Sequence, residues 1–187
     1  MCVNPRILKS VIVPIQRMPL SRMVFPNGKD GLCYCEGTIT TKAPQEWLKK
    51  LYSELPSGIE GFFQVFSPAA VGGKHHLAWA AYASHLAWKS HSMQAKKPEM
   101  ELLCHLAGQR QIPEAQSRVG IKSGKQEIVV VFVGNLSSLP KTIFPALYKS
   151  LRIQSKKVKW GSAITPSKDW PRSIQDFAIE KSALFES

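Results

Sequence analysis

The stretch from Pro98 to Gly120 constrains the fold more than any other part of the sequence. It reads PEMELLCHLAGQRQIPEAQSRVG, in which two short segments each begin with a proline and end with a glycine. Proline is favoured in the first turn of a helix, and glycine is favoured just past its last turn. The pattern therefore predicts two short helices, at 98–108 and 113–120, joined by a tight elbow as an αα-hairpin.

Strand and helix signals mix along the rest of the chain without a regular βαβ repeat. The strand expected at 127–134, EIVVVFVG, is almost wholly apolar, which is typical of the middle of a sheet. The helix expected at 74–89 is rich in alanine and apolar on nearly all sides, which predicts a central position in the core. The predicted fold class is α/β, in the form of an α+β mixed sheet packed with helices. The remaining expected strands are 7–15, 32–40 and 61–66, and the remaining expected helices are 44–55, 140–151 and 173–185.

Length and turn signals predict one domain with an N-terminal extension. A chain of 187 residues is long enough for one domain with a sizeable core. Residues 1–31 are basic and end in PNGKDG, a turn cluster that predicts the tip of a β-hairpin, so we assign them to a basic extension and residues 32–187 to the domain. The four cysteines do not suggest a disulfide framework, and Cys33 and Cys35 share one face of the expected strand as small apolar residues.

The charge is strongly positive and uneven. The formal net charge is +12, and the segment from Ile128 to Lys168 holds seven basic residues and no acidic one. Such an excess points to a polyanionic partner, most simply a nucleic acid, or to an acidic protein surface, although a solvated basic rim remains an alternative. No apolar run is long enough to cross a membrane, and no signal peptide pattern opens the chain, so we expect a cytoplasmic protein with no membrane partner.

Catalytic motifs are missing from the sequence. The segment VGGKHH at 71–76 lacks the first glycine and the Ser or Thr of a phosphate-binding loop. The five histidines fall between His75 and His105, but none of them shows the i, i+4 spacing that places two metal ligands on one helix face. We therefore expect no metal, no cofactor, no small-molecule substrate and no catalytic activity of its own, with a histidine- or metal-dependent RNA-modifying enzyme as the alternative.

Binding chemistry is concentrated at two turns. A Gly-Gly-Lys segment before a helix suits a phosphate, although a plain tight turn explains it equally well. In the elbow, an arginine between two glutamines suits phosphate oxygens and the edges of unpaired bases, unless the arginine only caps the preceding helix. Two lysines before the αα-hairpin add charge. The candidate site residues are Gly73, Lys74, His75, Lys96, Lys97, Gln109, Arg110 and Gln111.

These segments, in this order, resemble the small tRNA-recruiting subunit of the KEOPS complex, in its archaeal form, within the family that includes the p53-related-kinase-binding protein. The resemblance extends over 32–187 and is most specific at the elbow. The loop before the αα-hairpin departs from the family pattern, with Met93 and Gln94 where an Asn-Ile pair is usual. The matching residues are Gly73, Lys74, His76, Leu77, Glu101, Leu102, Leu103, Ala107, Gly108, Arg110, Gln111, Ile112, Gly120 and Ile121.

The resemblance implies a function that the residues alone do not. It implies a non-catalytic subunit that binds the kinase/ATPase subunit of the complex and the single-stranded 3′ CCA end of tRNA, in support of threonylcarbamoyl-adenosine modification. The elbow and the start of the helix at Lys74 are then expected to receive the tRNA tail. A regulatory module that binds only proteins is the remaining alternative, because kinase binding and tail binding are separable.

Overall fold

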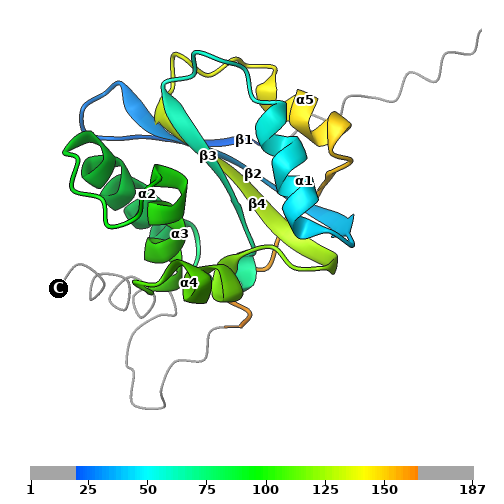
Figure 1. Cartoon of the computed structure of the whole chain (residues 1–187). Helices are drawn as coiled ribbons and strands as arrows, with labels where there is room; N and C mark the ends of the chain where they lie inside the picture. Colours follow the sequence, from blue (N-terminus) through cyan, green and yellow to red (C-terminus); the bar gives the residue numbers. More distant parts are fainter. Residues whose placement is uncertain (1–19, 164–187) are drawn as a thin grey trace, which may run out of the picture.

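A computed structural model describes residues 20–163 of the chain, and Figure 1 shows their arrangement. One antiparallel sheet holds all five described strands in the order β1-β2-β4-β3, with the short β5 paired to β2 further along the same edge as β1. The fold is a mixed α+β fold, as predicted. The strands are β1 Leu20–Val24, β2 Asp30–Thr41, β3 Gly61–Phe66, β4 Gly124–Asn135 and β5 Gln154–Ser155.

Helices cover both faces of this sheet. The α2, α3 and α4 helices pack on one face, and α1 and α5 pack on the other (Figure 1). The helices are α1 Pro44–Ser53, α2 Lys74–Lys89, α3 Pro98–Ala107, α4 Ile112–Val119 and α5 Ile143–Ser150, with one turn of 3-10 helix at Pro68–Ala70. The predicted αα-hairpin and the helix at 74–89 are thereby confirmed.

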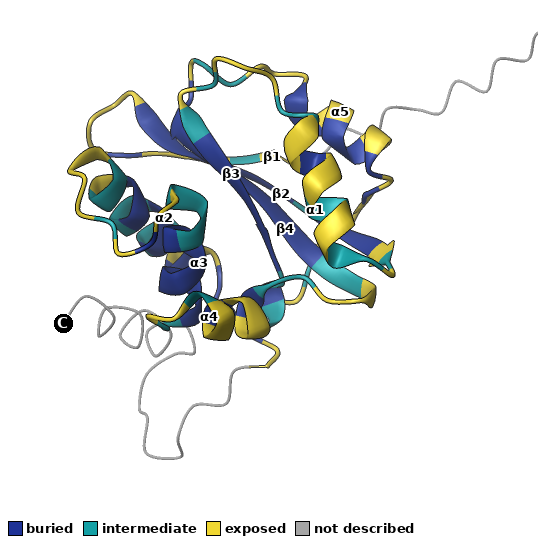
Figure 2. Ribbon diagram, in the orientation of Figure 1, coloured by how far each residue is buried: buried dark blue, intermediate teal, exposed yellow. Residues whose placement is uncertain are grey.

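The β4 strand joins the two hydrophobic cores because it lies between β2 and β3. Successive side chains of a strand point to opposite faces. Accordingly Val129, Val131 and Val133 pack with α2 and α3, while Val130 and Phe132 pack with α1 and α5. Residues 128–135 of β4 are all buried, and Figure 2 shows this part of the strand in dark blue. This two-sided burial explains the unbroken apolar run, and the expected mid-sheet position is confirmed.

The predicted hairpin tip is confirmed, but its first strand is not where a strand was expected. The strand that precedes the turn is Leu20–Val24, which pairs with β2 from Gly31 to Cys35. Residues 20–31, assigned above to an extension, thus contribute to the same sheet as the domain. The strand expected at 7–15 and the helix expected at 173–185 lie outside the described residues. Cys33 and Cys35 are buried free thiols on one face of β2, as expected, and burial raises the pKa of Cys33 to about 11.

The α2 helix buries only one side, although its sequence is apolar nearly all round. Its small residues Ala80, Ala81 and Ser84 face inward and are fully buried, which lets the helix lie close to its neighbours. On the other side Trp79 and Tyr82 are only partly buried, and Leu86 is 49% exposed. Apolar residues that the core does not need therefore line the surface of this helix.

Candidate nucleic-acid interface

The elbow between α3 and α4 is built on a glycine in a left-handed conformation. Gly108 has φ +58°, which carries little steric penalty for a residue without a Cβ atom. The N–H of Gly108 donates to the carbonyl of His105 at 3.2 Å, and the N–H of Gln109 donates to that of Cys104 at 3.1 Å. These two bonds form a Schellman turn that ends α3. The turn leaves Arg110 and Gln111 exposed and Gln109 partly buried.

An arginine does cap the end of α3, but it comes from α4. Arg118 Nη1 donates a hydrogen bond to the carbonyl oxygen of Ala107 at 3.0 Å. Capping of α3 was the structural alternative to a binding role for Arg110. At Ala107 the capping residue is Arg118, which no sequence signal singled out. The exposed Arg110 lies in the elbow beyond this cap.

A buried histidine brings the start of α2 to the elbow. His76 Nδ1 accepts a hydrogen bond from the N–H of Gly72 at 3.0 Å, and the ring also bonds to the backbone of His105 in the last turn of α3. Burial lowers the pKa of His76 to about 4, so the ring is neutral and Nδ1 can accept. Gly73, Lys74 and His75 therefore lie at the same end of the α2–α3 pair as the elbow.

Two details change the expected phosphate cradle at Gly72 and Gly73. The N–H of Gly72 is bound to His76, so it is not available to a ligand. Gly73 has φ +124°, a conformation that favours glycine and turns the chain into α2. No side chain caps the helix at Gly73, and the positive end of its dipole adds to the charge of Lys74. The groups left for an anion at this turn are thus the helix end and the Lys74 ammonium.

Lys74 has an acidic neighbour within the protein. Its Nζ lies 3.7 Å from Glu36 Oε1 on β2, and the lysine side chain remains 59% exposed. Glu36 also accepts hydrogen bonds from the backbone of Val158 and the indole of Trp160. This carboxylate therefore holds Lys74 beside the sheet while leaving its ammonium in contact with solvent.

The two remaining candidates lie at the other end of α3. Lys96 and Lys97 are exposed and directly precede the helix, with Lys97 at its N-cap. A helix of ten residues spans about 15 Å. The structure therefore brings Gly73, Lys74 and His75 together with Gln109, Arg110 and Gln111, and it separates the two lysines from them by the length of α3.

A groove between α2 and α3 lies between these two groups, although none of the candidate residues lines it, and sequence reasoning missed it. Its volume is about 490 Å³. One end reaches His105, beside the elbow, and the other reaches the loop before Lys96. The only sequence signal for it was the excess of apolar residues on α2. The lining residues are Trp79, Tyr82, Ala83, Leu86, Ala87, Ser90, Ser92, Gln94, Glu101 and His105.

Two buried polar side chains form part of the groove and fix its shape. Glu101 Oε2 accepts a hydrogen bond from the N–H of Ala95 at 2.7 Å, which ties the loop to α3. His105 Nε2 lies 3.8 Å from Glu101 Oε1, and its ring meets that of Trp79 edge-on. Burial lowers the pKa of His105 to about 4, so this contact is not an ion pair at neutral pH.

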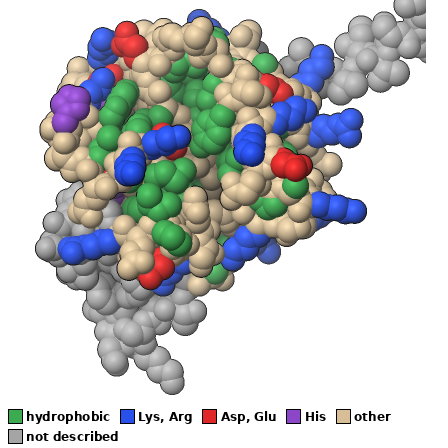
Figure 3. Space-filling view, viewed as in Figure 1, with side chains coloured by type: hydrophobic (Ala, Val, Ile, Leu, Met, Phe, Trp, Pro, Cys, Tyr) green, Lys and Arg blue, Asp and Glu red, His purple; other side chains and the backbone are tan. Residues whose placement is uncertain are grey.

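The other histidines in the described part of the chain do not form a metal site. Figure 3 shows Lys and Arg side chains scattered over one face of the molecule rather than collected in one patch. Within residues 20–163, no three His, Cys, Asp or Glu side chains are arranged to hold a metal ion. His85 Nε2 instead contacts Asp30 Oδ2 at 3.2 Å and anchors the β1–β2 turn to α2. None of the described helices is long and apolar enough to span a bilayer.

Comparison with known proteins gives one family. No curated protein matches the chain. Residues 44–176, which form most of the chain and include α2, the groove and the elbow, match the family described as kinase binding protein CGI-121. The chain therefore belongs to the CGI-121 family of kinase binding proteins.

Proposed function

We propose that this protein is the non-catalytic, kinase-binding and tRNA-recruiting subunit of a KEOPS complex. The family description supports the kinase partner. The net charge of +12 supports a polyanionic partner. As part of this proposal the protein is cytoplasmic, has no catalytic activity of its own, needs no cofactor or small-molecule substrate, and supports threonylcarbamoyl-adenosine modification by holding the tRNA.

The groove between α2 and α3 is the observation that carries the tRNA part of the proposal. Proteins bind single-stranded RNA by stacking its bases on aromatic side chains and by meeting its phosphates with Lys and Arg. The groove is lined by Trp79 and Tyr82, and Lys74 and Arg110 lie beyond its end at His105. Lys97 lies beyond the loop at its other end. The single-stranded CCA end then lies along α2, and its phosphates meet the cations at the ends.

The tRNA part is tested by measuring binding of intact tRNA and of the same tRNA without its CCA end over a series of salt concentrations. For the wild-type protein, removal of CCA should weaken binding about tenfold, which is about 1.4 kcal/mol. Arg110→Glu and Trp79→Ala should each weaken binding of intact tRNA by a similar factor and should add little to the effect of trimming.

Lys141→Glu is the matched control for charge. Lys141 is exposed and precedes α5, on the other face of the sheet. This variant should lower binding of both tRNAs equally and only at low salt, because it changes the general field and not the groove. If Arg110→Glu behaves in the same way as Lys141→Glu, the groove is not the tail site.

The kinase part is tested separately by co-purification with the kinase subunit of the complex. Wild-type protein and Arg110→Glu should bind the kinase equally, because the elbow is assigned to RNA. Kinase binding without any preference for intact tRNA would identify a module that binds only proteins. Modification or hydrolysis of RNA by the purified protein alone would instead identify an enzyme.

A further inference from the structure

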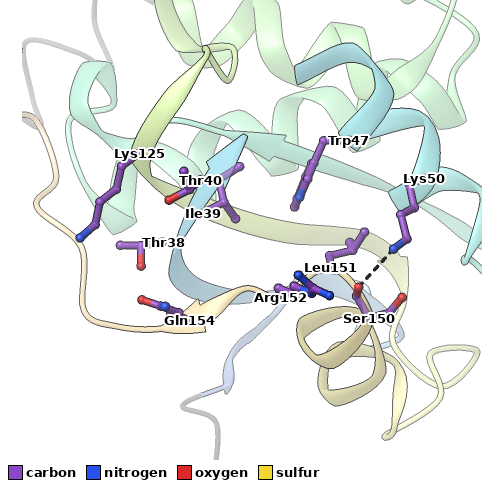
Figure 4. A pocket seen from close by; sticks show the side chains of 10 residues that line it. All are labelled: Thr38, Ile39, Thr40, Trp47, Lys50, Lys125, Ser150, Leu151, Arg152 and Gln154. Atoms are coloured by element: carbon purple, nitrogen blue, oxygen red, sulfur yellow. Dashed lines mark hydrogen bonds between the residues drawn. The ribbon is translucent and has the colours of Figure 1, made fainter. Parts of the chain in front are cut away.

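A second cavity lies on the other side of the molecule, between α1, the end of α5 and the outer edge of β2 (Figure 4). Its volume is about 470 Å³, which is within the range of small-ligand sites. None of the ten described residues that line it is acidic, while three of them are Lys50, Lys125 and Arg152. This cavity shares no residue with the groove between α2 and α3.

The cavity exists because the edge of β2 is only partly covered. Among the described strands, β5 pairs with β2 at Gly37 and Thr38 alone, and β1 pairs with β2 only as far as Cys35. The edge of β2 from Ile39 onward is therefore left without a strand partner in residues 20–163. Thr38 and Thr40, which carry hydroxyl groups, line the cavity along this edge.

The three cations around the cavity lack acidic partners within the described part of the chain. Lys50 Nζ donates to the carbonyl oxygen of Ser150 at 3.3 Å, which fixes it at the rim. Neither Lys125 nor Arg152 forms an ion pair with any residue from 20 to 163. Like charges around one cavity repel each other, and an anion bound between them removes that repulsion.

Arg152 is held in this position at a conformational cost. Its φ is +54°, in the left-handed region that disfavours residues with a side chain by about 1–2 kcal/mol. The hydrogen bonds from Ile153 N to Tyr148 O at 2.9 Å and from Arg152 N to Lys149 O at 3.4 Å form a Schellman turn, in which glycine is usual. A strained cation beside a cavity indicates a role for the guanidinium.

Trp47 supplies the flat surface of the cavity. The helical pattern of α1 predicts Trp47 as part of a buried stripe, but only Leu51 of that stripe is fully buried. Trp47 is partly buried, and Figure 4 shows its side chain pointing from α1 toward Leu151 and Arg152. An indole face beside a guanidinium is suited to a nucleobase that carries a phosphate.

We propose that this cavity binds a nucleotide, with its phosphate between Arg152 and Lys50 and its base against Trp47. The nucleotide is either free or one unit of an RNA chain, since both present the same chemistry. An acidic peptide added as a strand fits less well, because the open edge of β2, Ile39–Thr41, is only a few residues long.

The test uses the full-length, nitrogen-15-labelled protein and follows the indole N–H signals of its tryptophans by NMR. The Trp47 signal is identified with Trp47→Phe and the Trp79 signal with Trp79→Phe. The ligands are AMP, a hexamer of uridylate without a CCA end, and inorganic phosphate. AMP and the hexamer should both shift the Trp47 signal, and phosphate alone should bind more weakly. A lower dissociation constant for AMP identifies a free nucleotide as the source, and a lower one for the hexamer identifies RNA.

Three variants locate the binding energy. Arg152→Gly keeps the left-handed turn and Lys50→Gln keeps the helix, so neither should unfold the protein, and each should weaken binding at Trp47 about tenfold. Lys141→Ser removes the same charge outside the cavity and should change binding less than about twofold.

The proposal is overturned if both nucleotides leave the Trp47 signal unmoved, if phosphate binds as tightly as AMP, or if Lys141→Ser weakens binding as much as Arg152→Gly. Shifts at Trp79 report on the groove between α2 and α3 and stay independent of this result.

Discussion

The α3 and α5 helices end in the same turn, which α2 also makes at His91, but with different residues in it. The α3 helix ends with Gly108 at φ +58°, and the α5 helix ends with Arg152 at φ +54°. At both ends the last carbonyls are satisfied by the same pair of backbone hydrogen bonds. The comparison shows that backbone geometry does not decide which residue occupies the turn.

The two turns differ in which residue carries the side chain that faces a proposed ligand. At the elbow, glycine makes the turn, and the residues after it, Gln109 to Gln111, carry the side chains that we propose for the RNA tail. At the end of α5, one residue makes the turn and also extends a guanidinium into a cavity. At the elbow, one residue makes the turn and others are proposed to contact the ligand. At the end of α5, the strained Arg152 is proposed to do both.

The two regions also differ in how they respond to acid. All five histidines of the sequence lie between residues 75 and 105, on the side of α2 and α3, and none belongs to α1 or α5. His76 and His105 are buried, and burial lowers the pKa of each to about 4. The junction between α2 and the elbow therefore depends on neutral imidazoles.

The largest expected effect is a loss of stability in mild acid. Well above pH 6.5 these histidines are neutral in both the folded and the unfolded state. Below it the unfolded chain takes up protons first, so the free energy of unfolding falls by roughly 2 kcal/mol per histidine by pH 5 and levels off near pH 4. Urea unfolding at pH 7, 6 and 5 measures this loss.

His76→Asn provides the matched comparison for the acid effect. An asparagine amide has an acceptor for the Gly72 N–H and a donor for the backbone of His105, but it does not titrate. The variant should lose only about half as much stability between pH 7 and pH 5 as the wild type. Equal wild-type stability at pH 7 and pH 5 would contradict the assignment of the two buried histidines.

The next effect is the substitution of the glycine in the elbow. Gly108→Ala places a Cβ atom in a left-handed turn and should lower the free energy of unfolding by about 1 kcal/mol, after allowance for the stiffer unfolded chain. Because the turn also directs Arg110, binding of intact tRNA should weaken as well. Unchanged stability would show that α3 ends in a different turn in solution.

Much of the fold was predictable because its signals are local. Proline and glycine bracket α3 and α4, and the run of valines in β4 indicates burial on both faces. The predicted limits of α2 and β3 match the structure. The β1 strand was not predicted, since three of its apolar residues, Leu20, Met23 and Val24, are exposed and only its pairing with β2 defines it.

The sites were less predictable because they join residues that are distant in sequence. The Gly-Gly-Lys turn and the elbow were each recognised, but the contact between His76 and His105 that brings them together was not. The cavity at Arg152 combines β2, α1, β4 and the end of α5, and no local pattern links Thr38 to Gln154. A partly exposed tryptophan such as Trp47 looks like a core residue until the neighbouring elements are placed.

The smallest expected effect tests the comparison of the two turns most directly. Arg152→Gly relieves the left-handed strain but loosens the unfolded chain, so stability should rise by about 0.5–1 kcal/mol. His91→Gly is the control, because His91 follows α2 with φ +56° and lies outside the cavity. Both variants should be stabilised in urea unfolding at pH 7, but only Arg152→Gly should lose nucleotide binding at Trp47. A stability gain without that loss would mean that the strain at Arg152 serves no ligand in this cavity.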